Sequence, residues 1–143
     1  MKKKILNALT LVSGCLALPV SAAPFDGAQP LICASTEILE CIPGEGCNRV
    51  AAESIDAPQF IRIDFAANVL SAERVGGDKK VSQIERSETV DGKLILQGAE
   101  DGVEGVRDGL GWTLAIGQET GKMTLTASGD EVGFVIFGAC TAM

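Results

Sequence analysis

The sequence contains no histidine and no tyrosine, and it has a single tryptophan. Without histidine there is no Ser-His-Asp or Cys-His catalytic arrangement, no histidine metal ligand and no general base that ordinarily titrates near neutral pH. Without tyrosine there is no phenolic acid or nucleophile. Acidic residues are plentiful, but their spacing singles out no catalytic carboxylate pair. The chain is therefore predicted not to be an enzyme.

Motifs for cofactors and metals are also lacking. No glycine-rich stretch contains the phosphate-binding pattern G-x-x-x-x-G-K-[ST], so no cofactor is predicted. The acidic segment 100–109 offers oxygen ligands for calcium from Glu100, Asp101, Glu104 and Asp108. It does not contain the D-x-[DN]-x-[DN]-G calcium-loop pattern, and Arg107 lies among the acids. A solvated loop without a metal is the prediction for this segment.

Basic residues are fewer than acidic ones, 12 against 19, and the formal net charge is −7. An acidic surface disfavours nucleic acid and anionic lipid as direct partners and leaves a cationic protein as a candidate partner. Solubility alone is the alternative explanation for acidic charge on an exported protein.

The N-terminus has the pattern of an export signal. Three lysines at positions 2–4 precede a short apolar run, 5–20, and small residues follow, so cleavage is predicted after Ala22. Residues 1–22 would be the signal peptide and 23–143 a single β domain of net charge −10, since three lysines are lost. A periplasmic or secreted protein without a transmembrane segment is expected. The alternative is a lipobox, Val12-Ser13-Gly14-Cys15, which would anchor the protein to a membrane by lipid on Cys15.

Four cysteines remain after residue 22 and permit three pairings. We predict disulfides between Cys41 and Cys47, around a tight loop, and between Cys33 and Cys140, joining the first strand to the last. A zinc site would need closely paired cysteines, and these spacings do not match that pattern.

Residues 111–140 have the most regular pattern in the chain. Three apolar runs, 112–117, 122–127 and 131–140, alternate with polar turns at 118–121 and 128–130 that contain glycine. The period of two in each run is typical of a half-buried strand. The residues expected to face inward are Trp112, Leu114, Ile116, Met123, Leu125, Ala127, Val132, Phe134, Ile136 and Cys140.

Further strands are predicted at 31–40, 60–65, 69–74, 81–90 and 93–98, with residues 37–40 fitting a strand or a short helix equally. Asp91-Gly92 is the strongest two-residue hairpin signal. Short turns join most of these segments, and no long helical pattern is present. The sequence therefore predicts an all-β fold, an antiparallel up-and-down meander of about eight strands that curls into a small barrel or closed clam tied by disulfides.

Three side chains are candidates for a binding surface. Val135 and Phe137 lie on the outward face of the last predicted strand, which is therefore apolar on both faces. Either the extended leader, residues 24–30, or the 31–47 region covers them, or they contact a partner or an apolar ligand. Trp112 is expected in the core, or at a barrel mouth where it could stack on a ligand.

The segments WTLAI, TGKMTLTASGD, VGFVIFGACT, PQFIRIDF and LILQG resemble a group of small exported bacterial proteins of unknown function. The resemblance spans most of residues 23–143 and implies no activity and no site residues. More loosely, Ala127-Ser128-Gly129 is similar to the serine-glycine loop of periplasmic lysozyme inhibitors, although the tyrosine that follows in that family is absent here.

We expect an exported, non-enzymatic binding module for a small apolar ligand or a protein partner. The alternative is a periplasmic inhibitor of a cationic hydrolase such as lysozyme, with acidic contacts from residues 128–130 and 100–108.

Overall fold

The computed structural model describes residues 24–73, 79–106 and 108–143. The predicted signal peptide, the alternative lipid anchor at Cys15 and Arg107 lie outside the described residues. One short 3-10 helix, η1, interrupts a chain of strands. The elements are β1 (Leu31–Ile42), β2 (Gly46–Arg49), η1 (Ala52–Ile55), β3 (Phe60–Asp64), β4 (Val69–Glu73), β5 (Lys79–Gln83), β6 (Arg86–Val90), β7 (Lys93–Glu100), β8 (Leu110–Gly117), β9 (Lys122–Ser128) and β10 (Gly133–Ala142).

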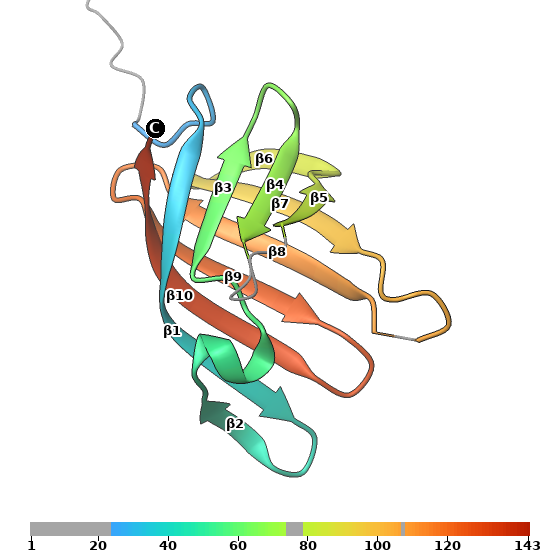
Figure 1. Ribbon diagram of the computed structural model, residues 1–143. Helices are drawn as coiled ribbons and strands as arrows, with labels where there is room; N and C mark the ends of the chain where they lie inside the picture. Colours follow the sequence, from blue (N-terminus) through green and yellow to red (C-terminus); the bar gives the residue numbers. More distant parts are fainter. Residues whose placement is uncertain (1–23, 74–78, 107) are drawn as a thin grey trace, which may run out of the picture.

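The strands form one antiparallel sheet that curls into an open half-barrel (Figure 1). Its order is β5-β4-β3-β1-β10-β9-β8-β7-β6, and β2 pairs with the end of β1 beside this path. Strands consecutive in sequence are neighbours in the sheet within β3-β4-β5 and within β6-β7-β8-β9-β10, whereas β5 and β6 lie at opposite edges and β1 lies between β3 and β10. The predicted all-β antiparallel meander tied by disulfides is confirmed.

The core lies inside the curl and contains the side chains that the period of two points inward. Leu114 and Ile116 on β8 are fully buried, as are Ile61 and Ile63 on β3 from the opposite arm of the sheet. Residues 37–40 belong to β1, with a register irregularity between Ser35 and Glu37, so the helical alternative for this segment is wrong. A strand is favoured here because β10 already offers it a pairing edge.

Both predicted disulfides are confirmed. Cys33 and Cys140 are directly opposed on β1 and β10, and Cys41 and Cys47 are directly opposed on β1 and β2. The first bond links positions 107 residues apart and holds the first long strand of the sheet against the last. The second closes the short β1–β2 hairpin.

The predicted strand 81–90 is two strands that bend at Ile84 and Glu85. The Ile84 N–H donates to the Asn68 carbonyl at 3.0 Å, on the β4 side, whereas the Glu85 N–H donates to the Gln97 carbonyl of β7 at 2.9 Å. The chain therefore passes here from one edge of the open sheet to the other. Ile84 is buried, and the side chains of β6 are exposed, as expected of an edge strand.

The two ends of the half-barrel differ. At the closed end, which bears the 118–121 turn, the Phe25 N–H donates to the Gln118 carbonyl at 3.2 Å, and its ring packs on Gly121. Phe65 contacts Gly27 at the same end. The leader 24–30 thus plugs the closed end, whereas the end that bears the 101–109 loop and the 129–132 turn, here called the open end, contains the candidate site.

Candidate functional site

A cavity of about 140 Å³ opens at the open end of the half-barrel, and we call it the mouth cavity. Its walls are interior side chains from both arms of the sheet together with the segment that follows η1. Because most of these groups are apolar, the cavity is suited to hydrocarbon rather than to a charged reactant. The main apolar contributors are Ile61, Leu70, Trp112, Leu125, Phe134 and Ile136.

Residues 55–58 form one wall because hydrogen bonds before and after η1 hold this part of the chain beside β1. The Val50 N–H donates to the Ile38 carbonyl at 3.0 Å, and the Ser35 N–H donates to the Gln59 carbonyl at 2.9 Å. Ser35 Oγ also donates to the Pro58 carbonyl at 3.1 Å. This anchoring brings residues 55–58 to the cavity, a placement that their weak sequence pattern did not predict.

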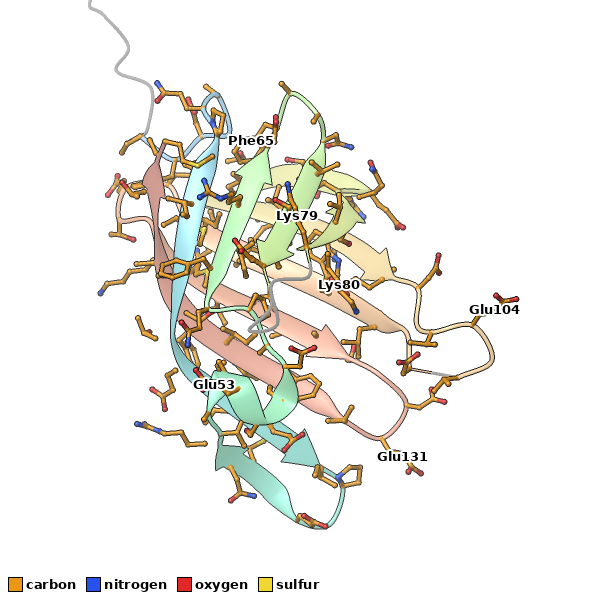
Figure 2. All side chains as sticks on the ribbon, viewed as in Figure 1. Glu53, Phe65, Lys79, Lys80, Glu104 and Glu131 are labelled. Atoms are coloured by element: carbon orange, nitrogen blue, oxygen red, sulfur yellow. A yellow bond between two sulfur atoms is a disulfide. The ribbon has the colours of Figure 1, made fainter. Side chains whose placement is uncertain are left out.

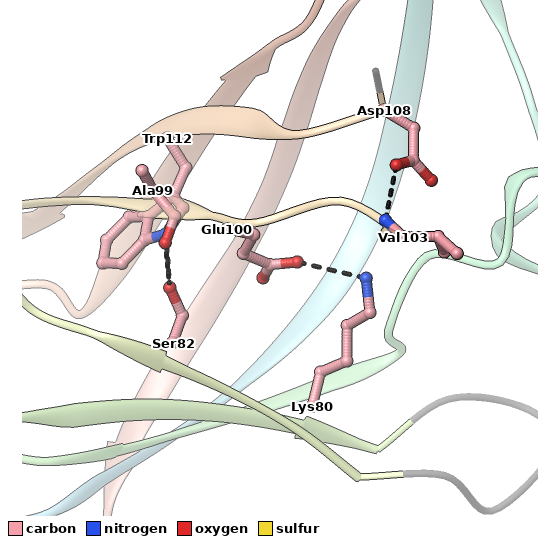
Figure 3. Close-up of polar contacts among 7 residues, drawn as sticks. All are labelled: Lys80, Ser82, Ala99, Glu100, Val103, Asp108 and Trp112. Atoms are coloured by element: carbon pink, nitrogen blue, oxygen red, sulfur yellow. Dashed lines mark hydrogen bonds and ion pairs between the residues drawn. The ribbon is translucent and has the colours of Figure 1, made fainter. Parts of the chain in front are cut away.

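Trp112 lines the mouth cavity and is 7% exposed. Its indole Nε1–H donates to Ser82 Oγ at 2.8 Å, and Ser82 Oγ donates in turn to the Ala99 carbonyl at 3.1 Å (Figure 3). Since these bonds satisfy the polar atom of the indole, the ring presents apolar surface to the cavity. Trp112 thus belongs to the buried core, as expected, and also lines the cavity.

Gly98 lets β5 approach β7 and β8 beside Trp112. A Cβ atom on Gly98 would overlap the Gln83 carbonyl and the Trp112 ring. The seam between β5 and β7 is thus tight at Gly98, and side chains of Ser82, Lys80 and Glu100 bridge it further toward the open end (Figure 3).

The rim of the mouth cavity carries charge of both signs. Lys80 Nζ lies 3.4 Å from Glu100 Oε2, and Asp56 also lines the cavity. The Lys80 and Glu100 side chains are 43% and 27% exposed, so solvent screens the pair and it contributes little to stability. Sequence reasoning missed Lys80, because nothing in the sequence links it to an acid 20 residues away.

Two loops flank the open end, and the lysozyme-inhibitor alternative depends on both. In the 101–109 loop, Asp108 Oδ1 accepts the Val103 N–H at 2.7 Å. Gly129 of the β9–β10 turn packs on Leu110, which also lines the cavity. Glu104 and Glu131 lie at the outer parts of these loops and point into solvent (Figure 2).

The candidate calcium ligands are not gathered into a metal site. Glu100 forms an ion pair with Lys80, and the Asp108 carboxylate accepts a hydrogen bond from the loop backbone at Val103. In the part of the chain that the structure describes, no group of three or more His, Cys, Asp or Glu side chains is arranged to hold a metal ion.

The structure separates the three candidate surface residues into two places. Trp112 faces the mouth cavity, whereas Val135 and Phe137 lie on the outer face of β10. Val135 is half-buried and Phe137 is 40% exposed. The 31–47 region pairs beside β10 as β1 rather than over it, so it does not cover Phe137.

Two more hollows are open surface features. One lies beside the Cys41–Cys47 hairpin and the 129–133 turn, and the other lies on the outer face near the irregularity in β1. Neither has the interior apolar walls of the mouth cavity, which is therefore the best-formed candidate site.

No protein-family model, curated protein or solved structure matches the chain. A search for membrane-spanning helices among the described residues finds none that is long and apolar enough.

Proposed function

We propose that this is an exported, non-enzymatic binding protein that holds the apolar part of a small ligand in the mouth cavity. The observation that carries the proposal is the apolar interior space of about 140 Å³ with Trp112 in its wall. Apolar side chains that line a concave site favour ligand hydrocarbon by removing it from water. The missing histidine and tyrosine support a binding role over catalysis.

Export is part of the proposal and rests on the disulfides and on the N-terminal pattern. Disulfides persist in oxidising compartments such as the periplasm, and both bonds contribute to holding this sheet together. The ligand would therefore be met outside the cytoplasm, by a protein that is either released after residue 22 or held to a membrane through Cys15.

The size of the cavity limits the ligand. A cavity of about 150 Å³ holds one benzene molecule, whereas drug-sized ligands occupy about 300 Å³ or more. At about 140 Å³ the mouth cavity accepts one aromatic ring or a chain of about six carbons. Any larger part of the ligand would project past Lys80 and Glu100 into solvent.

Trp112 provides a direct assay, because the chain has no other tryptophan and no tyrosine. Its fluorescence is to be followed while straight-chain alcohols from propanol to octanol are added. Each added methylene group should tighten binding about fourfold, from about 0.8 kcal/mol of transfer free energy, until the cavity is full. Beyond that length the gain per methylene should fall.

A matched pair of variants locates the site. Ala127 lines the cavity, and Ala127→Leu should fill it and weaken hexanol binding by about tenfold or more. Thr126 is the exposed neighbour on the same strand, and Thr126→Leu should leave binding unchanged. Equal hexanol affinities in the two variants would show that the alcohol binds elsewhere.

The second candidate function is inhibition of a cationic hydrolase such as lysozyme. It is supported by the position of the acidic 101–109 loop and the 129–132 turn on one end of the half-barrel. Titration of lysozyme activity with the purified protein tests it. No inhibition at micromolar protein would exclude this candidate.

A further inference from the structure

We infer that the ligand of the mouth cavity is a small organic ammonium ion, with its alkyl or aryl group inside the cavity and its positive charge at the rim. The inference rests on the proposed function and adds the charge of the ligand. It is carried by the chemistry of the rim, where Lys80 and Glu100 meet at the edge of the apolar space.

The protein already places one alkylammonium group at this position. Lys80 is part of the cavity lining, and its Nζ lies 3.4 Å from Glu100 Oε2 (Figure 3). A lysine side chain is a four-carbon alkyl stem that ends in an ammonium group. The rim thus accommodates an alkyl stem against the cavity together with an ammonium group beside the Glu100 carboxylate.

The Lys80–Glu100 pair is also easily exchanged. The two side chains are 43% and 27% exposed, and the distance of 3.4 Å is long for a charge-assisted hydrogen bond. Water can solvate Lys80 when it moves away, so its displacement by a ligand ammonium costs little. Glu100 would then gain a partner whose hydrocarbon is buried more deeply than the lysine stem.

The surrounding charge favours a cation over an anion. The two loops at the open end carry five acidic residues and one arginine, Arg107, and Glu100 at the end of β7 is a sixth acid beside them. A field of this sign attracts cations to the rim and repels carboxylates. The acidic residues are Glu100, Asp101, Glu104, Asp108, Asp130 and Glu131.

The experiment compares hexylammonium, hexanol and hexanoate on the full exported chain, with Trp112 fluorescence as the signal. These probes share a six-carbon tail and differ in charge. At low salt, hexylammonium should bind about tenfold more tightly than hexanoate, with hexanol between them. In about 0.5 M sodium chloride the three affinities should converge, because salt screens charges at an exposed rim.

Variants assign the effect to Glu100. Glu100→Gln should remove most of the preference for hexylammonium over hexanoate, because it removes the negative charge at the rim and keeps the size of the side chain. Glu104→Gln removes the same charge from an exposed loop position and should change the preference by less than about twofold. Lys80→Met keeps an unbranched stem, frees Glu100 and should strengthen hexylammonium binding.

Three results would overturn the inference. If hexanol binds and hexanoate binds as tightly as hexylammonium, the positive charge assigned to the ligand is wrong, although the proposed function stands. If none of the three probes binds, the proposed function fails and the inference fails with it. A preference for hexylammonium that persists in Glu100→Gln would also refute the role assigned to Glu100.

Discussion

Trp112 Nε1 donates a hydrogen bond to Ser82 Oγ at 2.8 Å, joining β8 to β5, which are not neighbours in the sheet. Ser82 is 4% exposed and passes the connection to the Ala99 carbonyl of β7. These side-chain hydrogen bonds therefore connect the edge strand β5 to β7 and β8 on the other arm of the half-barrel, beside the mouth cavity.

Ser82→Ala should destabilise the protein by about 1–3 kcal/mol, because it leaves the buried indole N–H and the Ala99 carbonyl without their partner. Urea denaturation followed by circular dichroism measures the loss. Ser87→Ala on the exposed strand β6 is the control and should stay within about 0.5 kcal/mol of the parent. Equal stabilities of the two variants would mean that the Ser82 bridge contributes nothing.

Gly98→Ala should cost about 1–3 kcal/mol, because the new methyl group overlaps the Gln83 carbonyl and the Trp112 ring. Gly111→Ala on β8 is the control, since an added Cβ there meets no atom within 4 Å. Thermal unfolding and the emission wavelength of Trp112 are the measurements. A Gly98 variant as stable as the Gly111 variant, with unchanged emission, would contradict the close contact at the seam.

The two disulfides should differ in their contribution to stability. Replacing Cys33 and Cys140 together by alanine should lower the free energy of unfolding by about 4–5 kcal/mol, since that bond spans 107 residues. The same change at Cys41 and Cys47, which are 6 residues apart, should cost about 2 kcal/mol. Denaturant titration of both double variants gives the comparison, and equal losses would argue against loop closure as the cause.

Much of the sheet was predictable because its signals are local. The alternation of Trp112, Leu114 and Ile116 assigns the inner face of β8 whatever the rest of the chain does, and the structure buries these side chains. Asp91-Gly92 forms the expected tight turn with positive φ at both residues. The disulfide pairing followed from joining the first predicted strand to the last, which the sheet order confirms.

The mouth cavity was not predictable, because its walls come from segments that carry no signal of their contact. Residues 55–58 are weakly patterned, and they reach the cavity only through hydrogen bonds to β1 and to the segment beside it. The bend at Ile84 divides β5 from β6, and no glycine or proline at this point of the sequence predicts it. It arises because the chain must leave β4 and join β7 on the far edge of the open sheet.

The sequence by itself determined the all-β class and the inward face of each regular strand, because the period of two and the short turns act between residues close in the chain. It left three disulfide pairings open, and the sheet decides between them by placing Cys33 opposite Cys140, 107 residues away. Only the tertiary structure decided that Trp112 faces a cavity while Val135 and Phe137 lie on the outer surface, and that Lys80 meets Glu100. Those relationships depend on how far the open sheet curls. That curl is set by twist and packing across the whole core rather than by any one segment.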